Sequence, residues 1–148
     1  MAAYHKAFEI RWADLDPNRH LRHTAYNDFA THVRFSYLKE HGFGPAEFTA
    51  YDFGPVITRE ETRFFREVGM TDTVTIDFKL QALSPAADRL CTSHDVTRSD
   101  GVLPARVVVD GVWLNLTTRK PMAPPPELAE MMRTMARTDD YQDLPGRP

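Results

Sequence analysis

Residues 24–41 constrain the fold most, because they form one long helical pattern in a chain otherwise rich in strand signals. Apolar residues recur there every three or four positions, which is typical of a helix with one buried face. These residues are Tyr26, Phe29, Ala30, Val33, Tyr37 and Leu38. Thr24 is placed to cap the start and Gly42 the end. A helix of about five turns needs another surface against which to bury this face.

Strand patterns fill most of the remaining chain. β-branched, aromatic or alternating residues occupy 4–12, 56–68, 73–83, 90–98 and 105–116. Short turns at 69–72 and 99–101 join neighbouring strands, which favours antiparallel pairing. The sequence therefore predicts an α+β fold, with an antiparallel sheet packed on the long helix. Methionines and Leu128 at helical spacing predict a short helix over 126–136, followed by a flexible tail.

Composition narrows the class of protein. With 148 residues, the chain has the size of one domain, so we expect a single domain over 1–148. A net charge of −3 gives no overall attraction to nucleic acid. No stretch approaches the roughly 18 apolar residues of a membrane helix, and no signal-peptide pattern opens the chain. Cys91 is the single cysteine, which excludes an intrachain disulfide. We therefore expect a cytoplasmic protein that binds neither nucleic acid nor membrane.

The polar segment before the helix contains the candidate chemistry. Residues 12–26 read Trp-Ala-Asp-Leu-Asp-Pro-Asn-Arg-His-Leu-Arg-His-Thr-Ala-Tyr. This segment resembles the motif of hot-dog acyl thioesterases of the 4-hydroxybenzoyl-CoA thioesterase type. In that family an Asp-x-Asp pair is followed by a His and by a Tyr that enters the long helix, and Asp14, Asp16, His20 and Tyr26 stand at those places. The similarity covers about residues 6–122 and implies a hot-dog fold, in which the sheet wraps around one central helix.

Residues 16–20 also resemble the Asp-x-Asn-x-His element of plant acyl-carrier-protein thioesterases, where it carries catalytic residues. The two resemblances imply that Asp16, Asn18 and His20 are catalytic. Chemically, thioester hydrolysis needs a carboxylate that attacks the carbonyl or activates water, and Asp16 can supply it. The same residues also suit an Asx turn, in which the carboxylate only accepts backbone hydrogen bonds and His20 only ties the loop in place. Asp14 is expected to stabilise the turn.

Substrate contacts and rival carboxylates lie elsewhere in the sequence. Tyr26 is a candidate substrate-binding residue, and Arg119 and Lys120 are candidates for contact with CoA phosphates, although a charged strand end has the same appearance. Glu60 and Glu61 are alternative carboxylates, because some hot-dog thioesterases use a glutamate. The remaining histidines show no metal-ligand spacing, so we expect no metal and no cofactor.

Together these observations predict an acyl-CoA thioesterase. The alternatives are an acyl-carrier-protein thioesterase, a hot-dog hydratase or dehydratase, and a catalytically silent module that binds acyl thioesters. Family resemblance implies a homodimer or homotetramer with the active site at the subunit interface. Long edge strands, which need pairing or covering, favour the same expectation.

Overall fold

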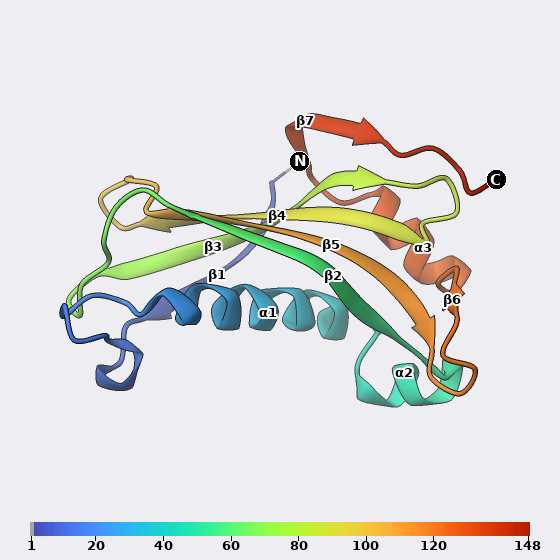
Figure 1. Cartoon of the computed structure of the whole chain (residues 1–148), viewed down its shortest axis with the longest axis horizontal. Helices are drawn as coiled ribbons and strands as arrows, with labels where there is room; N and C mark the ends of the chain where they lie inside the picture. The colour runs from blue at the N-terminus through green and yellow to red at the C-terminus, as the bar shows by residue number, and fades with distance from the viewer. Residues whose placement is uncertain (1) are drawn as a thin grey trace.

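The computed structural model describes residues 2–148 as a curved sheet with the long helix α1 along one face (Figure 1). In chain order the elements are β1 (Tyr4–Glu9), the 3-10 turn η1 (Trp12–Asp14), α1 (His23–Glu40), α2 (Pro45–Tyr51), β2 (Phe53–Phe64), β3 (Thr73–Leu83), β4 (Arg89–Arg98), β5 (Ala105–Asn115), β6 (Pro121–Met122), α3 (Pro126–Arg133) and β7 (Arg137–Asp143). The predicted α+β hot-dog architecture is confirmed.

The main sheet has the strand order β1-β3-β4-β5-β2, and all its neighbours are antiparallel. Strand β6 adds a short antiparallel pairing to β5. Strand β2 lies at one edge of this order, where its second side has no partner strand among residues 2–148. The turn that follows β2 and the loop that precedes α1 meet at one end of the molecule, through a bridge between His20 and Gly69.

The period-two pattern of the strands explains how the sheet encloses α1. In β3 the even-numbered residues from Val74 to Leu80 are buried, whereas the odd-numbered ones face outward and are partly exposed. On the helix, Ala25, Tyr26, Ala30, Val33 and Tyr37 are buried at helical spacing. These two apolar surfaces form one core, so burial of apolar area is the main force that holds α1 on the sheet.

Several boundaries differ from the sequence predictions. Strand β1 ends at Glu9, because the chain turns into η1, where the expected strand ran to residue 12. Strand β2 spans Phe53–Phe64 in place of 56–68, and Leu116 lies just beyond β5. Helix α2 covers residues for which the sequence predicted neither a helix nor a strand; Pro45 occupies its first turn, where a missing N–H costs no hydrogen bond.

The C-terminal segment is the largest difference. The chain was expected to end in a helix over 126–136 and a flexible tail, but α3 stops at Arg133 and residues after it form β7. Strand β7 pairs in parallel with the part of β3 around Leu80 to Leu83, beyond Phe78, which pairs with the first residue of β1, Tyr4. The tail is ordered because it supplies the edge hydrogen bonds that β1 leaves open. No helix within residues 2–148 has the length and apolarity needed to cross a bilayer.

Candidate active site

The loop between β1 and α1 holds Asp16 in a closely bonded turn. The backbone N–H of Asp16 donates to the carbonyl of His20 at 2.8 Å, and the N–H of Arg19 donates to the carbonyl of Asp16 at 3.0 Å. Carboxylate Oδ1 accepts the N–H groups of Asn18 at 2.8 Å and His20 at 3.2 Å. This is the Asx turn that the residue types predict. It fixes the orientation of the carboxylate, and Oδ2 accepts no hydrogen bond from any described residue.

The turn is closed at its base by Leu15 and Leu21, and Leu21 fastens it to the rest of the fold. Leu21 is buried, its N–H donates to the carbonyl of Val68 at 2.7 Å, and it forms a bridge with Leu15. These contacts attach the Asp16 turn to the β2–β3 connection. Such a loop holds a carboxylate in a fixed direction. This suits a catalytic site, since a small displacement of a reacting group lowers the reaction rate strongly.

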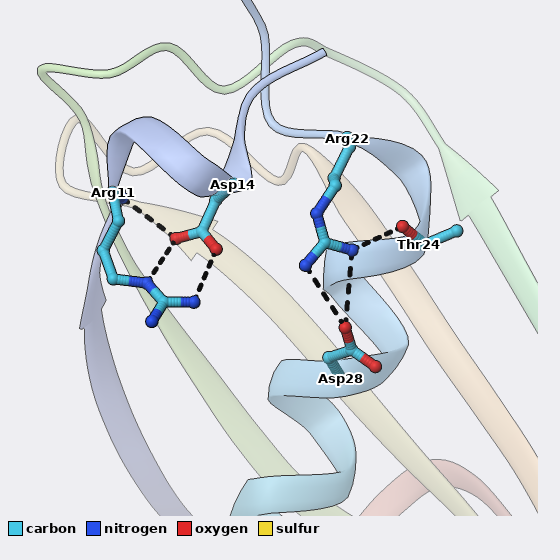
Figure 2. A network of polar contacts seen from close by, with 5 residues as sticks. All are labelled: Arg11, Asp14, Arg22, Thr24 and Asp28. Carbon is cyan, nitrogen blue, oxygen red and sulfur yellow. Dashed lines mark hydrogen bonds and ion pairs between the residues drawn. The ribbon is translucent and has the colours of Figure 1, made fainter.

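Asp14 has a different environment, although it stands two residues away. Its side chain is 0% exposed, and the Arg11 guanidinium forks onto it with contacts of 2.8 and 3.1 Å (Figure 2). The Arg11 backbone N–H donates to the same carboxylate at 2.9 Å. The hydrogen bonds from Arg11 hold the pKa of Asp14 below its usual range, despite the opposing effect of burial. Every contact of this carboxylate is internal, so Asp14 stabilises the turn, as expected.

The first turn of α1 begins directly after the Asp16 turn. The N-cap is Arg22, with no capping side chain; Thr24, expected as the cap, lies inside the helix and accepts a hydrogen bond from the Arg22 guanidinium. Arg22 also reaches Asp28, so this pair covers the flank of the helix (Figure 2). The N–H groups at this helix start are therefore left without a side-chain cap, and the helix dipole favours negative charge there.

Tyr26 is buried beside Asp16. Burial, together with the negative charge of Asp16, raises the pKa of Tyr26 to about 12, so its hydroxyl stays protonated at neutral pH. Its ring meets Phe64 of β2 edge to face, with ring centroids 5.3 Å apart. The structure thus brings together Asp16, Tyr26 and the backbone of the turn. Asn18 and His20 join this group through their backbones, whereas their exposed side chains make no hydrogen bond to a described residue.

Arg119 and Lys120 lie at the other end of the sheet. They follow β5, whose last residue, Asn115, pairs with Phe53 at the start of β2. The Asp16 turn contacts the connection beyond the end of β2, roughly 35 Å away at the usual rise of a strand. Arg119 has a left-handed backbone (φ 61°) in a tight turn, and its guanidinium donates to the Leu116 carbonyl. Within one chain, these two basic residues do not meet Asp16.

The two alternative glutamates face opposite sides of the sheet. Thr62 receives a hydrogen bond from Asn27 of α1, so alternate residues of β2, including Glu60, face the helix. Glu61 faces outward and pairs with Arg59 at 2.9 Å and Arg63 at 3.3 Å. Glu61 thereby belongs to a solvated charged face. Glu60 is the one glutamate of the two that lies on the α1 side of β2.

A polar pair inside the fold was not foreseen from the sequence. The Arg34 guanidinium donates to Nε2 of the fully buried His94 at 3.0 Å, and His94 Nδ1 donates to the Asp77 carbonyl at 2.7 Å. Arg34 borders the apolar stripe of α1, and no pattern in the sequence links it to His94. No group of three or more His, Cys, Asp or Glu residues within residues 2–148 is arranged to hold a metal ion.

Comparison with known families decides where the chain belongs. Residues 10–132 match the Thioesterase-like superfamily, a span that includes the Asp16 turn, α1 and the strands β2 to β5 of the main sheet. The chain belongs to this superfamily. Its members' chemistry makes the protein a thioester hydrolase, in agreement with the sequence prediction. A comparison with curated protein sequences gives no match.

Solved structures confirm the fold. A Staphylococcus aureus protein determined in complex with CoA superposes with a TM-score of 0.86 at 19% identity, over 95% of this chain and 90% of that one. A 1,4-dihydroxy-2-naphthoyl-CoA thioesterase from Synechocystis gives 0.80 at 16% identity, over 90% and 97%. The dynemicin thioesterase gives 0.82 at 18% identity, over 93% and 99%. At these identities the likeness establishes the hot-dog architecture.

Proposed function

We propose that this thioester hydrolase acts on acyl-CoA, with Asp16 as the reacting carboxylate. The observation that carries the proposal is the geometry of Asp16: one carboxylate oxygen is fixed by two backbone N–H groups, and the other is free beside an uncapped helix start. That the S. aureus structural relative was determined with CoA supports CoA as the carrier.

The reaction follows from the parts of this site. Asp16 Oδ2 accepts a proton from water as the water oxygen bonds to the thioester carbonyl carbon; alternatively, Oδ2 forms that bond itself and water then hydrolyses the anhydride. The N–H groups at the start of α1 stabilise the negative charge on the carbonyl oxygen. The C–S bond then breaks, and CoA leaves as a thiolate that takes up the proton. Asn18 and His20 border the reacting centre as candidate catalytic residues, and Tyr26 as a substrate contact.

A second copy of the chain would complete the site. Strand β2 presents an open edge, and Val56, Ile57 and Phe64 on it expose 36%, 42% and 51% of their surface. Two β2 strands paired antiparallel about a two-fold axis would cover these residues. The same pairing reverses the direction of the second sheet, so its Arg119 and Lys120 turn would approach the Asp16 end of the first. We therefore propose a homodimer at minimum, in which one chain supplies Asp16 and the other the contacts to the CoA phosphates.

One experiment separates this function from its alternatives. Purified protein is incubated with acyl-CoAs of graded chain length and with aromatic acyl-CoAs, while a thiol reagent follows CoA release and light scattering follows oligomeric state. We expect CoA release by a dimer or tetramer. If the acyl group is released from acyl carrier protein and not from CoA, the carrier is acyl carrier protein. Interconversion of enoyl and hydroxyacyl thioesters would indicate a hydratase. Saturable binding without turnover would indicate a silent module, and a fully active monomer would contradict the shared site.

A further inference from the structure

A cavity of about 390 Å³ lies between α1 and the sheet, towards the C-terminal half of the helix. Phe78, Trp113, Met132 and Met135 are among its mainly apolar lining residues. Arg34 is the one charged side chain among the described residues that line it. An apolar cavity of this size suits an acyl group, but a guanidinium in its wall is unusual, because charged side chains are costly to bury without a partner.

The orientation of Arg34 is fixed by a chain of hydrogen bonds. A carbonyl cannot donate, so the 2.7 Å contact with the Asp77 carbonyl places the His94 proton on Nδ1. Nε2 is then the acceptor for Arg34 Nη1, while Nη2 donates to Thr31 Oγ1 at 3.0 Å. Burial, reinforced by the Arg34 charge, lowers the pKa of His94 to about 3, so the ring stays neutral. The positive charge of Arg34 is therefore held by two neutral acceptors.

No carboxylate within residues 2–148 lies at ion-pair distance from this guanidinium. Burial lowers the pKa of Arg34, and the acidic residue whose negative charge opposes this shift is Glu60, which is exposed on the edge strand β2. A guanidinium has five N–H donors, and His94 and Thr31 accept from only two of its nitrogens. Donors thus remain for an anion that enters the cavity, and a carboxylate fits the fork of a guanidinium in a bidentate manner.

The position of Arg34 along α1 sets the length of such a ligand. Asn27, Thr31 and Arg34 lie on one stripe of the helix, and this stripe faces β2 through the bond between Asn27 and Thr62. The stripe runs from the Asp16 end of α1 towards the cavity. From Tyr26, beside Asp16, to Arg34 is eight residues, or about 12 Å at the helical rise. An acyl chain of medium length spans this distance when its thioester carbonyl is at Asp16.

We propose that the acyl pocket selects medium-length acyl groups that carry a carboxylate at the end remote from the thioester, with Arg34 as the residue that binds it. The proposal rests on the acyl-CoA thioesterase function proposed above. In this arrangement His94 is a positioning residue, because it holds the guanidinium without touching the substrate. The apolar walls contact the methylene chain, and the free N–H groups of Arg34 bind the remote carboxylate.

The test compares two substrates of equal carbon number, octanedioyl-CoA and octanoyl-CoA, by kcat/KM. We expect the wild type to prefer octanedioyl-CoA by at least about tenfold, since hydrogen bonds between charged groups are stronger than those between neutral groups. Arg34→Met should remove the preference by lowering kcat/KM for octanedioyl-CoA only, and Arg34→Lys should retain part of it. Arg106→Met is the matched control, because Arg106 pairs with Asp95 on the outer face of the sheet.

Three outcomes would overturn the proposal. One is a wild type without preference between the two esters, which decides the question even if Arg34→Met fails to fold. The second is an equal loss for both esters in folded Arg34→Met, which would indicate a structural role, and the third is the same loss of preference in Arg106→Met. If neither ester nor any acyl-CoA of the panel described above is hydrolysed, the proposed function fails. Calorimetric binding of both esters to the wild type and to Arg34→Met then tests the carboxylate subsite separately: tighter binding of octanedioyl-CoA that depends on Arg34 supports it, and equal binding contradicts it.

Discussion

The carboxylates of Asp14 and Asp16, in adjacent turns of one loop, have opposite environments. In η1 the carboxylate of Asp14 is fully buried, and Arg11 contacts both of its oxygens. In the next turn Asp16 is partly exposed, and only its Oδ1 is bonded, by backbone N–H groups. A buried carboxylate with both oxygens bonded inside the protein holds a structure together. A carboxylate with a fixed direction and a free oxygen can react. The surroundings of the two aspartates therefore distinguish a structural role from a reactive one, which residue type alone does not.

Substitution of Asp16 should give the largest effect on rate. Asp16→Asn keeps the shape and an oxygen that can accept the backbone N–H groups, but it removes the basic and nucleophilic carboxylate. We expect kcat to fall at least about a hundredfold, the lower end of what a positioned base contributes. Steady-state kinetics with the best acyl-CoA measures this, with thermal midpoint and light scattering as controls for fold and assembly. Near wild-type turnover in a folded oligomer would contradict the assignment.

His20 should have an intermediate effect. Its backbone supplies one N–H to Asp16 and bridges to Gly69, whereas its side chain is exposed and makes no bond to the described residues. His20→Ala leaves the backbone bonds in place, so we expect kcat to fall by no more than about tenfold, through looser positioning of the turn. A loss as large as that of Asp16→Asn would instead make His20 a direct participant. The pH profile of kcat distinguishes the two, because loss of a titrating catalytic imidazole would change its shape.

Asp14→Asn should chiefly lower stability. The substitution replaces one acceptor oxygen by an NH2 group that faces the Arg11 donors, so a buried group loses its partner, at a cost of about 1–3 kcal/mol. Urea unfolding measures this loss, and kcat in the folded protein should change much less than in Asp16→Asn. An unchanged free energy of unfolding, or a rate loss that matches Asp16→Asn, would remove the distinction between the turns.

The same carboxylate predicts a pH dependence of stability. Arg11 lowers the pKa of Asp14 in the folded protein below the value of about 3.9 in the unfolded chain. The stabilisation is therefore complete above that unfolded value and is lost as the pH falls from about 4 through the folded pKa. Urea unfolding across this acid range should show a smaller pH slope in Asp14→Asn than in the wild type. Identical slopes would mean that this ion pair does not contribute.

The sequence predicted those parts of the molecule that local patterns determine. Helix α1 and strand β3 follow from their periodicity, and the Asx turn follows from Asp16-Pro-Asn. Strand β7 was missed because its charged residues carry no alternation and its pairing with β3 is non-local. The Arg34 contact with His94 joins residues 60 positions apart, and the burial that gives it meaning exists only in the fold. Helices, strands and turns that depend on nearby residues can be predicted from the sequence, whereas contacts between residues far apart in the sequence cannot.

Substitution of the glutamates of β2 should have the smallest effect on kcat. These residues lie outside the loop, so they test whether Asp16 is the reacting carboxylate. Glu61 is ion-paired on the outer face, where such pairs contribute little, so Glu61→Gln should leave kcat unchanged. Glu60 lies on the α1 side of β2, and its charge opposes the lowering of the Arg34 pKa by burial, so we expect Glu60→Gln to alter substrate binding more than Glu61→Gln. Neither change should lower kcat by as much as the loss of up to roughly tenfold expected for His20→Ala, and both should fall far short of the roughly hundredfold contribution of a positioned base. Because both substitutions neutralise one carboxylate on one strand, Glu61→Gln is a matched control for Glu60→Gln. If Glu60→Gln abolishes turnover while Asp16→Asn retains it, the free oxygen of Asp16 is not the reacting group, and the reaction uses the carboxylate of β2.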